Sequence, residues 1–148
     1  MKVFLDTNIF IEYFEQRNDY QYVDKILCAI EDKKINAIIS VGCVYTLAYM
    51  VRMELKNQGI HRPEQTQRLR YTLNTVLSIV NAANVSHQRL IKGINDLAFD
   101  DLEDSFQYQC AVQNKCNYLI TINLRDFKFA DNSKLEIITP KEFVNKYL

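Results

Sequence analysis

The chain has 148 residues, of which 48% are hydrophobic and 24% charged, and this composition fits one domain that can bury a core. Its 18 basic and 18 acidic side chains cancel, which excludes capture of nucleic acid by overall positive charge but leaves a locally basic groove open. The small numbers of glycines (three) and prolines (two) argue against a turn-rich all-β fold.

The spacing of apolar residues alternates along the chain between short continuous runs, typical of buried strands, and helical periodicity. Ser40 is a good N-cap for one of the helices, and Pro63 suits the first turn of another. In chain order we expect a strand at 2–5, helices at 8–14 and 20–30, a strand at 35–39, helices at 41–56 and 63–80, a short strand at 84–85, helices at 88–97 and 101–113, strands at 118–121 and 135–138, and a helix at 140–144.

This alternation of strands and helices predicts an α/β sandwich with a mostly parallel central sheet. The sequence contains no internal repeat, low-complexity stretch or linker, so we expect a single domain over residues 1–148.

The start of the chain and its cysteines indicate a cytoplasmic protein. MKVFLDTN lacks the apolar core of a signal peptide, and no apolar run is long enough to span a membrane. The four cysteines form no Cys-x-x-Cys pair and lie away from both histidines, so we expect reduced, mostly buried thiols and no zinc site.

Acidic residues are crowded before the expected helix at 101–113, where four of the five residues from Asp100 to Asp104 are Asp or Glu. Like charges in such a cluster raise one another's pKa, and a divalent cation relieves that cost. Hard cations such as Mg²⁺ prefer oxygen ligands and keep several waters for a phosphate substrate.

Other oxygen-bearing side chains directly follow two expected strands. Asp6 ends the first strand, and Thr121, Asn123 and Asp126 end or follow the strand at 118–121. Because sites in parallel sheets form beyond the carboxyl ends of strands, these residues and Asp104 are predicted to converge. Such a group can support metal-assisted hydrolysis of a phosphodiester.

Each of these residues also has a structural interpretation. Asp100, Asp101 and Asp6 could simply cap helices, since carboxylates favour helix N-termini. Asn123 and Asp126 could be ordinary turn residues.

Taken together, four segments resemble the PIN domain, the nuclease fold of VapC-type toxins from bacterial toxin–antitoxin pairs. They occur in the family's order and span nearly the whole chain. The segments are VFLDTNI at 3–9, DLEDSFQ at 101–107 followed by Ala111, LITINLRDF at 119–127, and ITPKEF at 138–143.

The resemblance implies a three-layer α/β/α sandwich around a parallel sheet. It also implies an endoribonuclease that uses Mg²⁺ or Mn²⁺, acts on an RNA substrate, forms a homodimer and is held silent by an antitoxin protein. For the dimer, the helices between 41 and 80 offer apolar side chains that could equally be core, namely Leu47, Tyr49, Met50, Met53 and Leu73.

By motif, Asp6 matches the family's first metal carboxylate and Asp104 its third, with Ala111 seven residues later as expected. Asn123 falls where many members have a fourth Asp, and Asp126 matches the Asp of a closing Asp-Phe pair. The residues expected to support this cluster are Thr7, Asn8, Thr121 and Thr46.

The chain departs from the family pattern at two positions. Thr46 stands where the family usually has a Glu, with Glu54 two turns too late, and Asn123 carries no charge. Asp101 and Glu103, next to Asp104, are the candidates to compensate as metal ligands. Because Mg²⁺ affinity follows ligand charge, we expect weaker metal binding than a complete site would give.

The sequence therefore predicts a metal-dependent toxin ribonuclease. The alternative is a PIN-fold module that binds RNA or protein through a degenerate, weakly active or inactive site. A nuclease acting on DNA is a third possibility that nothing in the neutral composition favours.

Overall fold

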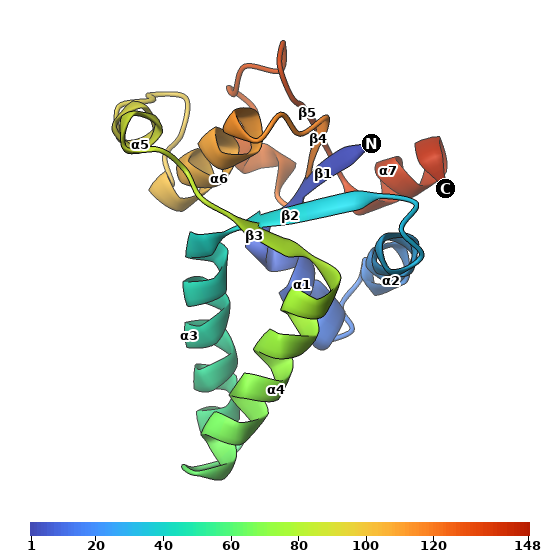
Figure 1. Ribbon diagram of the computed structural model, residues 1–148, viewed down its shortest axis with the longest axis vertical. Helices are drawn as coiled ribbons and strands as arrows, with labels where there is room; N and C mark the ends of the chain where they lie inside the picture. Colours follow the sequence, from blue (N-terminus) through green and yellow to red (C-terminus); the bar gives the residue numbers. More distant parts are fainter.

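A five-stranded sheet lies at the centre of the computed structural model, which describes all 148 residues (Figure 1). All four strand pairings are parallel, and the strand order is β3-β2-β1-β4-β5. The strands are β1 (Lys2–Leu5), β2 (Asn36–Ser40), β3 (Asn81–Ala83), β4 (Tyr118–Ile120) and β5 (Glu136–Ile138). The helices are α1 (Thr7–Phe14), α2 (Tyr20–Glu31), α3 (Val41–Asn57), α4 (Glu64–Ile79), α5 (His87–Ile94), α6 (Leu102–Gln113) and α7 (Pro140–Tyr147), with one 3₁₀ turn at Leu124–Phe127.

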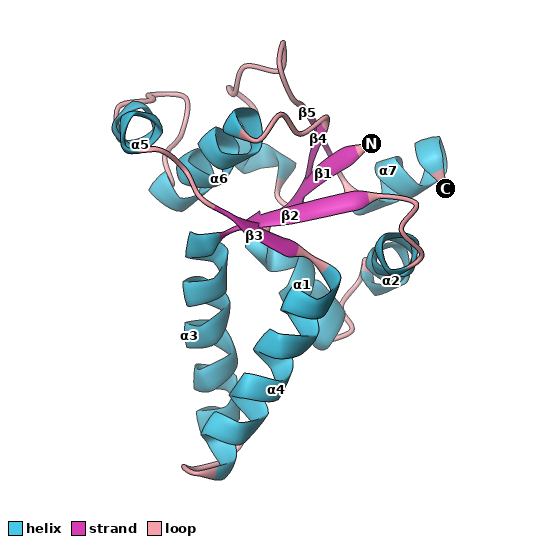
Figure 2. Ribbon diagram, viewed as in Figure 1, coloured by secondary structure: helices cyan, strands magenta, loops and turns pink.

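Helices cover both faces of the sheet, which confirms the predicted three-layer α/β/α fold. Figure 2 shows α5 and α6 on one side of the strands and α1, α2 and α7 on the other. Helices α3 and α4 run alongside each other and extend away from the sheet as a two-helix arm.

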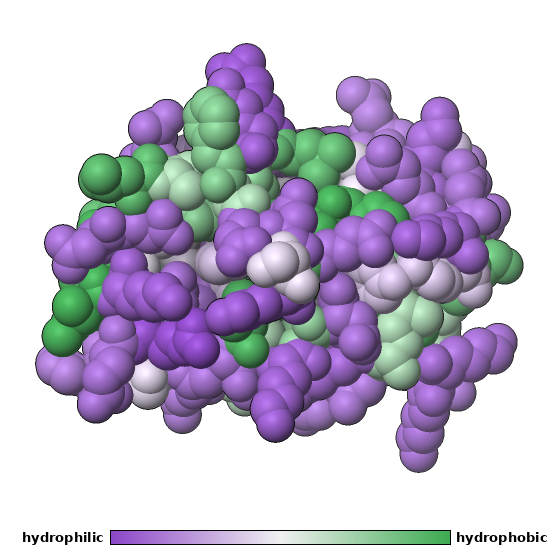
Figure 3. Space-filling view, turned by 90° about the horizontal axis from the view of Figure 1, so that it is seen from above, coloured by the Kyte–Doolittle hydropathy of each residue, from purple (hydrophilic) through white to green (hydrophobic).

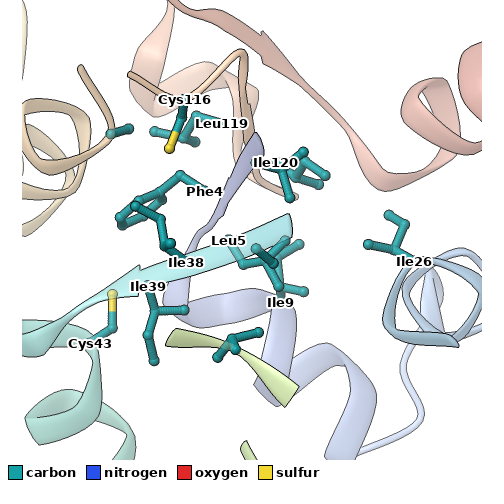
Figure 4. Packing of buried hydrophobic residues seen from close by; sticks show 14 of the residues in the cluster. Phe4, Leu5, Ile9, Ile26, Ile38, Ile39, Cys43, Cys116, Leu119 and Ile120 are labelled. Atoms are coloured by element: carbon teal, nitrogen blue, oxygen red, sulfur yellow. The ribbon is translucent and has the colours of Figure 1, made fainter. Parts of the chain in front are cut away.

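The core is continuous across the sheet because the inner strands are apolar on both faces, as expected for a parallel sheet covered by helices. Phe4 of β1 pairs in register with Ile38 of β2 and Leu119 of β4, and all three are buried. Figure 4 shows Ile9 and Ile26, from α1 and α2, packed into the same cluster. This packing fixes the directions of β1 and β4, and therefore where their carboxyl ends lie.

Three predicted elements differ from the structure, one of them because the last helix runs to Tyr147 and not only to residue 144. The strand at 84–85 was wrong because β3 pairs earlier, with Asn81 to Ala83 opposite Ile38 to Ser40, and this short edge strand has no run of large apolar residues. The helix predicted to reach residue 97 ends at Ile94. There the Asn95 side chain bonds the Ile91 carbonyl at 2.8 Å and Asp96 accepts from the Ala98 N–H at 3.0 Å, which turns the chain out of the helix.

The apolar residues expected to offer a dimer surface on α3 and α4 are mostly only half-buried, and one of them is in the core. Leu47 is part of the core, and Met50, Met53 and Leu73 are half-buried. Tyr49 alone of this set is exposed, so the two-helix arm presents less apolar surface than the sequence suggested.

The cysteines fit the prediction of mostly buried thiols, since Cys43, Cys110 and Cys116 are buried, Cys28 is exposed, and all four are free. No helix is both long and apolar enough to cross a membrane. The face seen in Figure 3 is mostly hydrophilic, with hydrophobic side chains in small separate areas.

Candidate active site

The carboxylate of Asp6 lies at the carboxyl end of the central strand and is only 1% exposed. Its backbone N–H donates to the Ile120 carbonyl at 3.0 Å, which extends the β1–β4 pairing by one residue. One carboxylate oxygen, Oδ2, accepts a 2.7 Å hydrogen bond from the Thr121 hydroxyl. The other, Oδ1, lies 3.5 Å from the backbone N–H of Asn8.

Thr121 connects this carboxylate to the loop after β4. Its side chain is fully buried, and its N–H donates to the Ile138 carbonyl at 3.1 Å, so it continues the β4–β5 pairing. Its hydroxyl oxygen accepts the backbone N–H of Asn123 at 3.0 Å. A single threonine therefore orients Asp6 and fixes the start of the segment that carries Asn123 and Asp126.

The first turn of α6 supplies the other acidic residues. Asp101 caps the helix by accepting the Glu103 N–H at 2.8 Å. Glu103 in turn accepts a 3.3 Å bond from the Thr7 hydroxyl, and the buried Ser105 hydroxyl donates to the Gly93 carbonyl at 2.7 Å. The Thr7–Glu103 bond holds the N-terminus of α6 against the start of α1, just beyond β1, and the Ser105–Gly93 bond holds α6 against α5.

These elements enclose one small polar cavity of about 170 Å³. Nine of the ten residues predicted for the site line it, and the tenth, Thr121, lies behind Asp6 and bonds to it. The lining residues are Asp6, Thr7, Asn8, Thr46, Met50, Asp101, Glu103, Asp104, Gln107, Asn123 and Asp126.

The carboxylates of the cavity disfavour one another's charge. Burial, followed by the charges of Asp6, Asp101, Asp126 and Glu103, raises the pKa of Asp104 to about 7. Burial also raises the pKa of Asp6, against hydrogen bonds from Thr121 and Gln107 that lower it. No lysine or arginine lines the cavity, so no side chain of the protein neutralises this charge.

Comparison with known proteins identifies the domain. A family model for the PIN domain matches residues 2–125. The chain belongs to the PIN domain family.

Curated and solved relatives agree with this family. Ribonuclease VapC1 of Aquifex aeolicus (strain VF5) is 24% identical over 148 residues, covering 99% of this chain and 95% of the relative. The crystal structure of VapBC2 from Rickettsia felis, bound to a DNA fragment from their promoter, contains a chain with a TM-score of 0.66 at 19% identity, over 93% of this chain and 98% of that one. The crystal structure of DNA-bound VapBC from Salmonella typhimurium contains a chain that matches with a TM-score of 0.68 at 16% identity, over 95% of this chain and 98% of that one. The structure of VapBC-1 from nontypeable Haemophilus influenzae contains a chain that matches with a TM-score of 0.65 at 20% identity, over 95% of this chain and 99% of that one.

Two residues of this PIN domain cavity were missed by the sequence analysis. The buried side chain of Gln107 accepts the Thr7 N–H at 3.2 Å and the Cys43 thiol at 3.4 Å, and so ties α6 to α1 and α3. Gln107 lies four residues after Glu103 and therefore on the same helix face, and this spacing could have predicted it as a site residue. Met50, the apolar member of the lining, carries no comparable signal.

The structural interpretations of the acidic residues hold in part. Asp101 does cap α6, and Asp6 does face the N-terminus of α1, but both also line the cavity. Asn123 and Asp126 form a turn, with the Asp126 N–H bonded to the Asn123 carbonyl at 3.0 Å, and their side chains also reach the cavity. Glu54 lies elsewhere, bonded to Gln58 in the exposed last turns of α3.

The donor set fits a hard divalent ion. Five carboxylates and three side-chain amides line the cavity, whose volume accommodates an ion with several waters at about 30 Å³ each. No three Asp, Glu, His or Cys side chains are grouped so that together they could hold a metal ion. Mg²⁺ needs no such group, because it commonly uses one or two carboxylates and keeps the rest of its shell as water and phosphate.

The crowding at Asp104 predicts a pH dependence of stability without metal. Its folded pKa, about 7, exceeds the ordinary value of 3.8, so the folded state retains a proton that the unfolded chain releases between these values. This contribution is complete below the ordinary pKa and is lost as the pH rises through about 7. Urea unfolding in EDTA should therefore show the free energy of unfolding falling across this range.

Asp104→Asn removes the titrating group and should flatten that slope. At about pH 8 it should raise the free energy of unfolding by about 1 kcal/mol, less than the full pKa shift implies because solvent screens a half-exposed carboxylate. Asp32→Asn, at an exposed ion pair with Lys34, is the matched control and should leave the slope unchanged. An identical slope in wild type and Asp104→Asn would contradict the interpretation.

Proposed function

We propose that this PIN domain is an endoribonuclease dependent on Mg²⁺ or Mn²⁺, and that it is the toxin of a toxin–antitoxin pair. The observation that carries the proposal is the convergence of β1, β4 and α6 on one cavity, through the Asp6–Thr121 bond and the Thr7–Glu103 bond. The relative named Ribonuclease VapC1 supports the choice of RNA as substrate.

In this proposal Asp6 and Asp104, which both line the cavity, would hold the ion. A divalent ion bound there would polarise a phosphoryl oxygen and lower the pKa of an attacking water. Thr121 keeps one oxygen of Asp6 engaged and so fixes the orientation of the other. Neither histidine lines the cavity, so the protein offers no imidazole base at this place.

Asn123 and Asp126 act at the rim, where the loop after β4 meets the acidic cavity. The Asn123 amide can accept from water or coordinate weakly, and Asp126 can orient water by accepting hydrogen bonds. Their placement depends on Thr121, whose hydroxyl fixes the backbone of the loop at Asn123.

Glu103 is proposed to supply the charge that is missing at Thr46. Both residues line the cavity, and burial raises the pKa of Glu103, an effect that hydrogen bonding from Thr46 and Thr7 only partly offsets. Thr46 therefore lies beside the carboxylate of Glu103, which enters from α6 rather than from α3.

Cleavage assays test the nuclease directly. Unpaired and hairpin RNAs should be cut with Mg²⁺ or Mn²⁺ and not with EDTA, and matched DNA should be cut more slowly. Asp6→Asn and Asp104→Asn should each lower the rate by more than about 100-fold, since even outer partners of metal ligands are worth 10 to 100-fold. Asp32→Asn should match wild type, and wild-type rates in Asp6→Asn would reject the assignment.

A charge exchange tests the role of Glu103. Glu103→Gln should raise the Kd for Mn²⁺ by about tenfold, and adding Thr46→Glu in that background should restore most of the affinity because a carboxylate then enters the cavity from α3. Glu54→Gln, a change of the same kind outside the cavity, should have no effect. Failure of Thr46→Glu to restore binding would show that Glu103 is not the compensating ligand.

Thr46 also motivates the second candidate function, a module that binds RNA or protein without cutting. A cavity with one acid fewer than the family pattern and a neutral Asn123 binds an ion less tightly. Titration of the folded protein with Mn²⁺ decides between the two. Absence of binding at millimolar metal, in protein that binds RNA, would favour the module.

An antitoxin is the proposed protein partner, as the solved VapBC neighbours suggest. A groove of about 850 Å³ between α1, α3 and α4 is its proposed seat, lined by side chains that include Phe14, Tyr49 and Met53. Met50 lines both this groove and the acidic cavity, so a partner there would lie beside the site. The protein encoded next to this chain should inhibit cleavage, and retained activity in its presence would reject it as the antitoxin.

The homodimer is proposed to form through α5. This helix turns its small side inward, where a Cβ on Gly93 would lie 3.1 Å from the Phe106 ring, and it presents an apolar side outward. The exposed residues on this side and on the segment that follows it are Leu90, Ile91, Ile94, Leu97 and Leu102. Leu97 is 96% exposed. Apolar side chains that are exposed together in this way mark an interaction surface, which a second copy would cover.

Light scattering with size-exclusion chromatography measures the dimer. Wild type should have twice the chain mass, and Ile94→Glu should shift it to one chain mass because the new charge cannot be buried in an apolar contact. Leu77→Glu, at an exposed leucine of α4, should leave the dimer intact. A monomeric wild-type protein would reject the dimer altogether.

A further inference from the structure

A second polar pocket lies beside the acidic cavity, and two residues line both. It has a volume of about 530 Å³, and Asp101 and Asp126 line both hollows. Its remaining lining residues are Ala98, Asp100, Arg125, Lys128 and Phe129. A chain that crosses the acidic cavity can therefore continue into this pocket without leaving the surface.

Two cationic side chains, Arg125 and Lys128, line the pocket beside the carboxylates of Asp100, Asp101 and Asp126. Arg125 and Lys128 are exposed and take part in none of the four salt bridges, which join Arg17, Lys34, Arg68 and Lys146 to acidic partners. The acidic cavity has only carboxylates among its charged residues, whereas the neighbouring pocket adds two cations that form no salt bridge. These cations can contact one phosphate of a nucleic acid whose next phosphate lies at an ion in the acidic cavity.

An aromatic ring stands among these cations. Phe129 is 71% exposed, and the Lys128 ammonium lies 4.7 Å from the centre of its ring. A single exposed apolar residue needs no explanation by itself. Here the ring lines a pocket beside two cations, which is the combination that single-stranded nucleic acid uses, with bases stacked on aromatic side chains and phosphates near basic ones.

The segment that carries these three residues is firmly anchored. Phe127, two residues before Phe129, is buried and meets the Phe99 ring edge-to-face at 5.8 Å. The Ala130 N–H bonds the Phe127 carbonyl at 3.0 Å, and the Tyr108 hydroxyl donates to the Asp131 carbonyl at 2.6 Å. Because the backbone is held on both sides of Phe129, binding a ligand there costs little backbone conformational entropy.

We propose that this pocket holds the unpaired nucleotide next to the cleaved phosphate, with its base stacked on Phe129 and its phosphate between Arg125 and Lys128. The proposal rests on the proposed ribonuclease function and adds to it the residues that would hold one unpaired nucleotide of the RNA, Arg125, Lys128 and Phe129. A base inside a duplex has both faces covered by its neighbours and cannot present one to Phe129.

Binding without cleavage tests the proposal. The probe is a fluorescein-labelled unpaired 12-nucleotide RNA, titrated in Mg²⁺ with protein carrying Asp104→Asn, which blocks cutting. In that background Phe129→Ala and Phe129→Leu should each raise the Kd about tenfold, because a leucine keeps the apolar surface but offers no ring. Phe129→Tyr should bind like the parent, and Tyr71→Ala, at a comparably exposed ring on α4, is the matched control.

The cations are tested through salt dependence. Arg125→Gln and Lys128→Gln should each weaken binding and reduce the slope of log K against log salt by about 0.7 for each phosphate of the single strand that the protein no longer neutralises. Lys141→Gln, on the exposed surface of α7, should change neither quantity. The same RNA sequence placed in a hairpin stem should bind the parent weakly and show no effect of Phe129→Ala.

The outcomes separate this subsite from the nuclease itself. If wild-type protein does not cut RNA but Phe129→Ala loses binding, the subsite stands and the nuclease assignment fails. If wild type cuts RNA while Phe129→Ala keeps both the Kd and kcat/KM of Tyr71→Ala, the subsite is overturned and the nuclease stands. Equal affinity of the protein for the unpaired RNA and for the hairpin stem also overturns the subsite. So does a finding that the pocket binds a protein segment and not RNA.

Discussion

The burial of one carboxylate at the end of the central strand is the constraint on which the rest of this site depends. Taking the Asp6 charge out of water costs several kcal/mol unless hydrogen bonds compensate. Thr121 and Gln107 provide that compensation, from β4 and α6 respectively. The residues whose hydrogen bonds offset the cost of burying Asp6 are therefore also the residues that join β1, the end of β4 and α6. The same contacts stabilise the fold and set the geometry of the site.

The second constraint is the approach of α6 to the sheet, which decides where Asp104 lies. Ser105, the next residue, is bonded to the Gly93 carbonyl, and the absence of a side chain at Gly93 lets α5 lie close on Phe106. Ala111, on the same helix, is fully buried where α6 packs inward. The pair α5–α6 thus forms one unit whose inner side sets the acidic cavity and whose outer side is the exposed apolar surface of α5.

The position of each residue in the chain decides how much of the fold and of the acidic cavity could be predicted from the sequence. Asp6 and Thr121 were predictable because a parallel sheet brings the ends of neighbouring strands together, and apolar runs mark those ends clearly. Gln107 was not, because a glutamine inside a helix reads as a surface residue until the elements around it are known. The proximity of Glu103 to Thr46 was equally hidden, since it depends on how α6 approaches α3. The edge strand β3 was not predicted because its pairing with β2, and not any run of large apolar residues of its own, makes it a strand.

The neutral composition of the chain conceals a local separation of charge that bears on the order of events. Without an ion, a phosphate entering the acidic cavity would face five carboxylates and no cation. Raised pKa values at Asp104 and Glu103 show that the protein only partly tolerates this charge on its own. In the proposed function, an RNA strand would be attracted first by the free cations of the neighbouring pocket, and its phosphate would settle over the carboxylates only once an ion neutralises them. Ion binding and substrate binding would then be thermodynamically linked, each favouring the other, because the bound ion attracts the phosphate that the bare carboxylates repel.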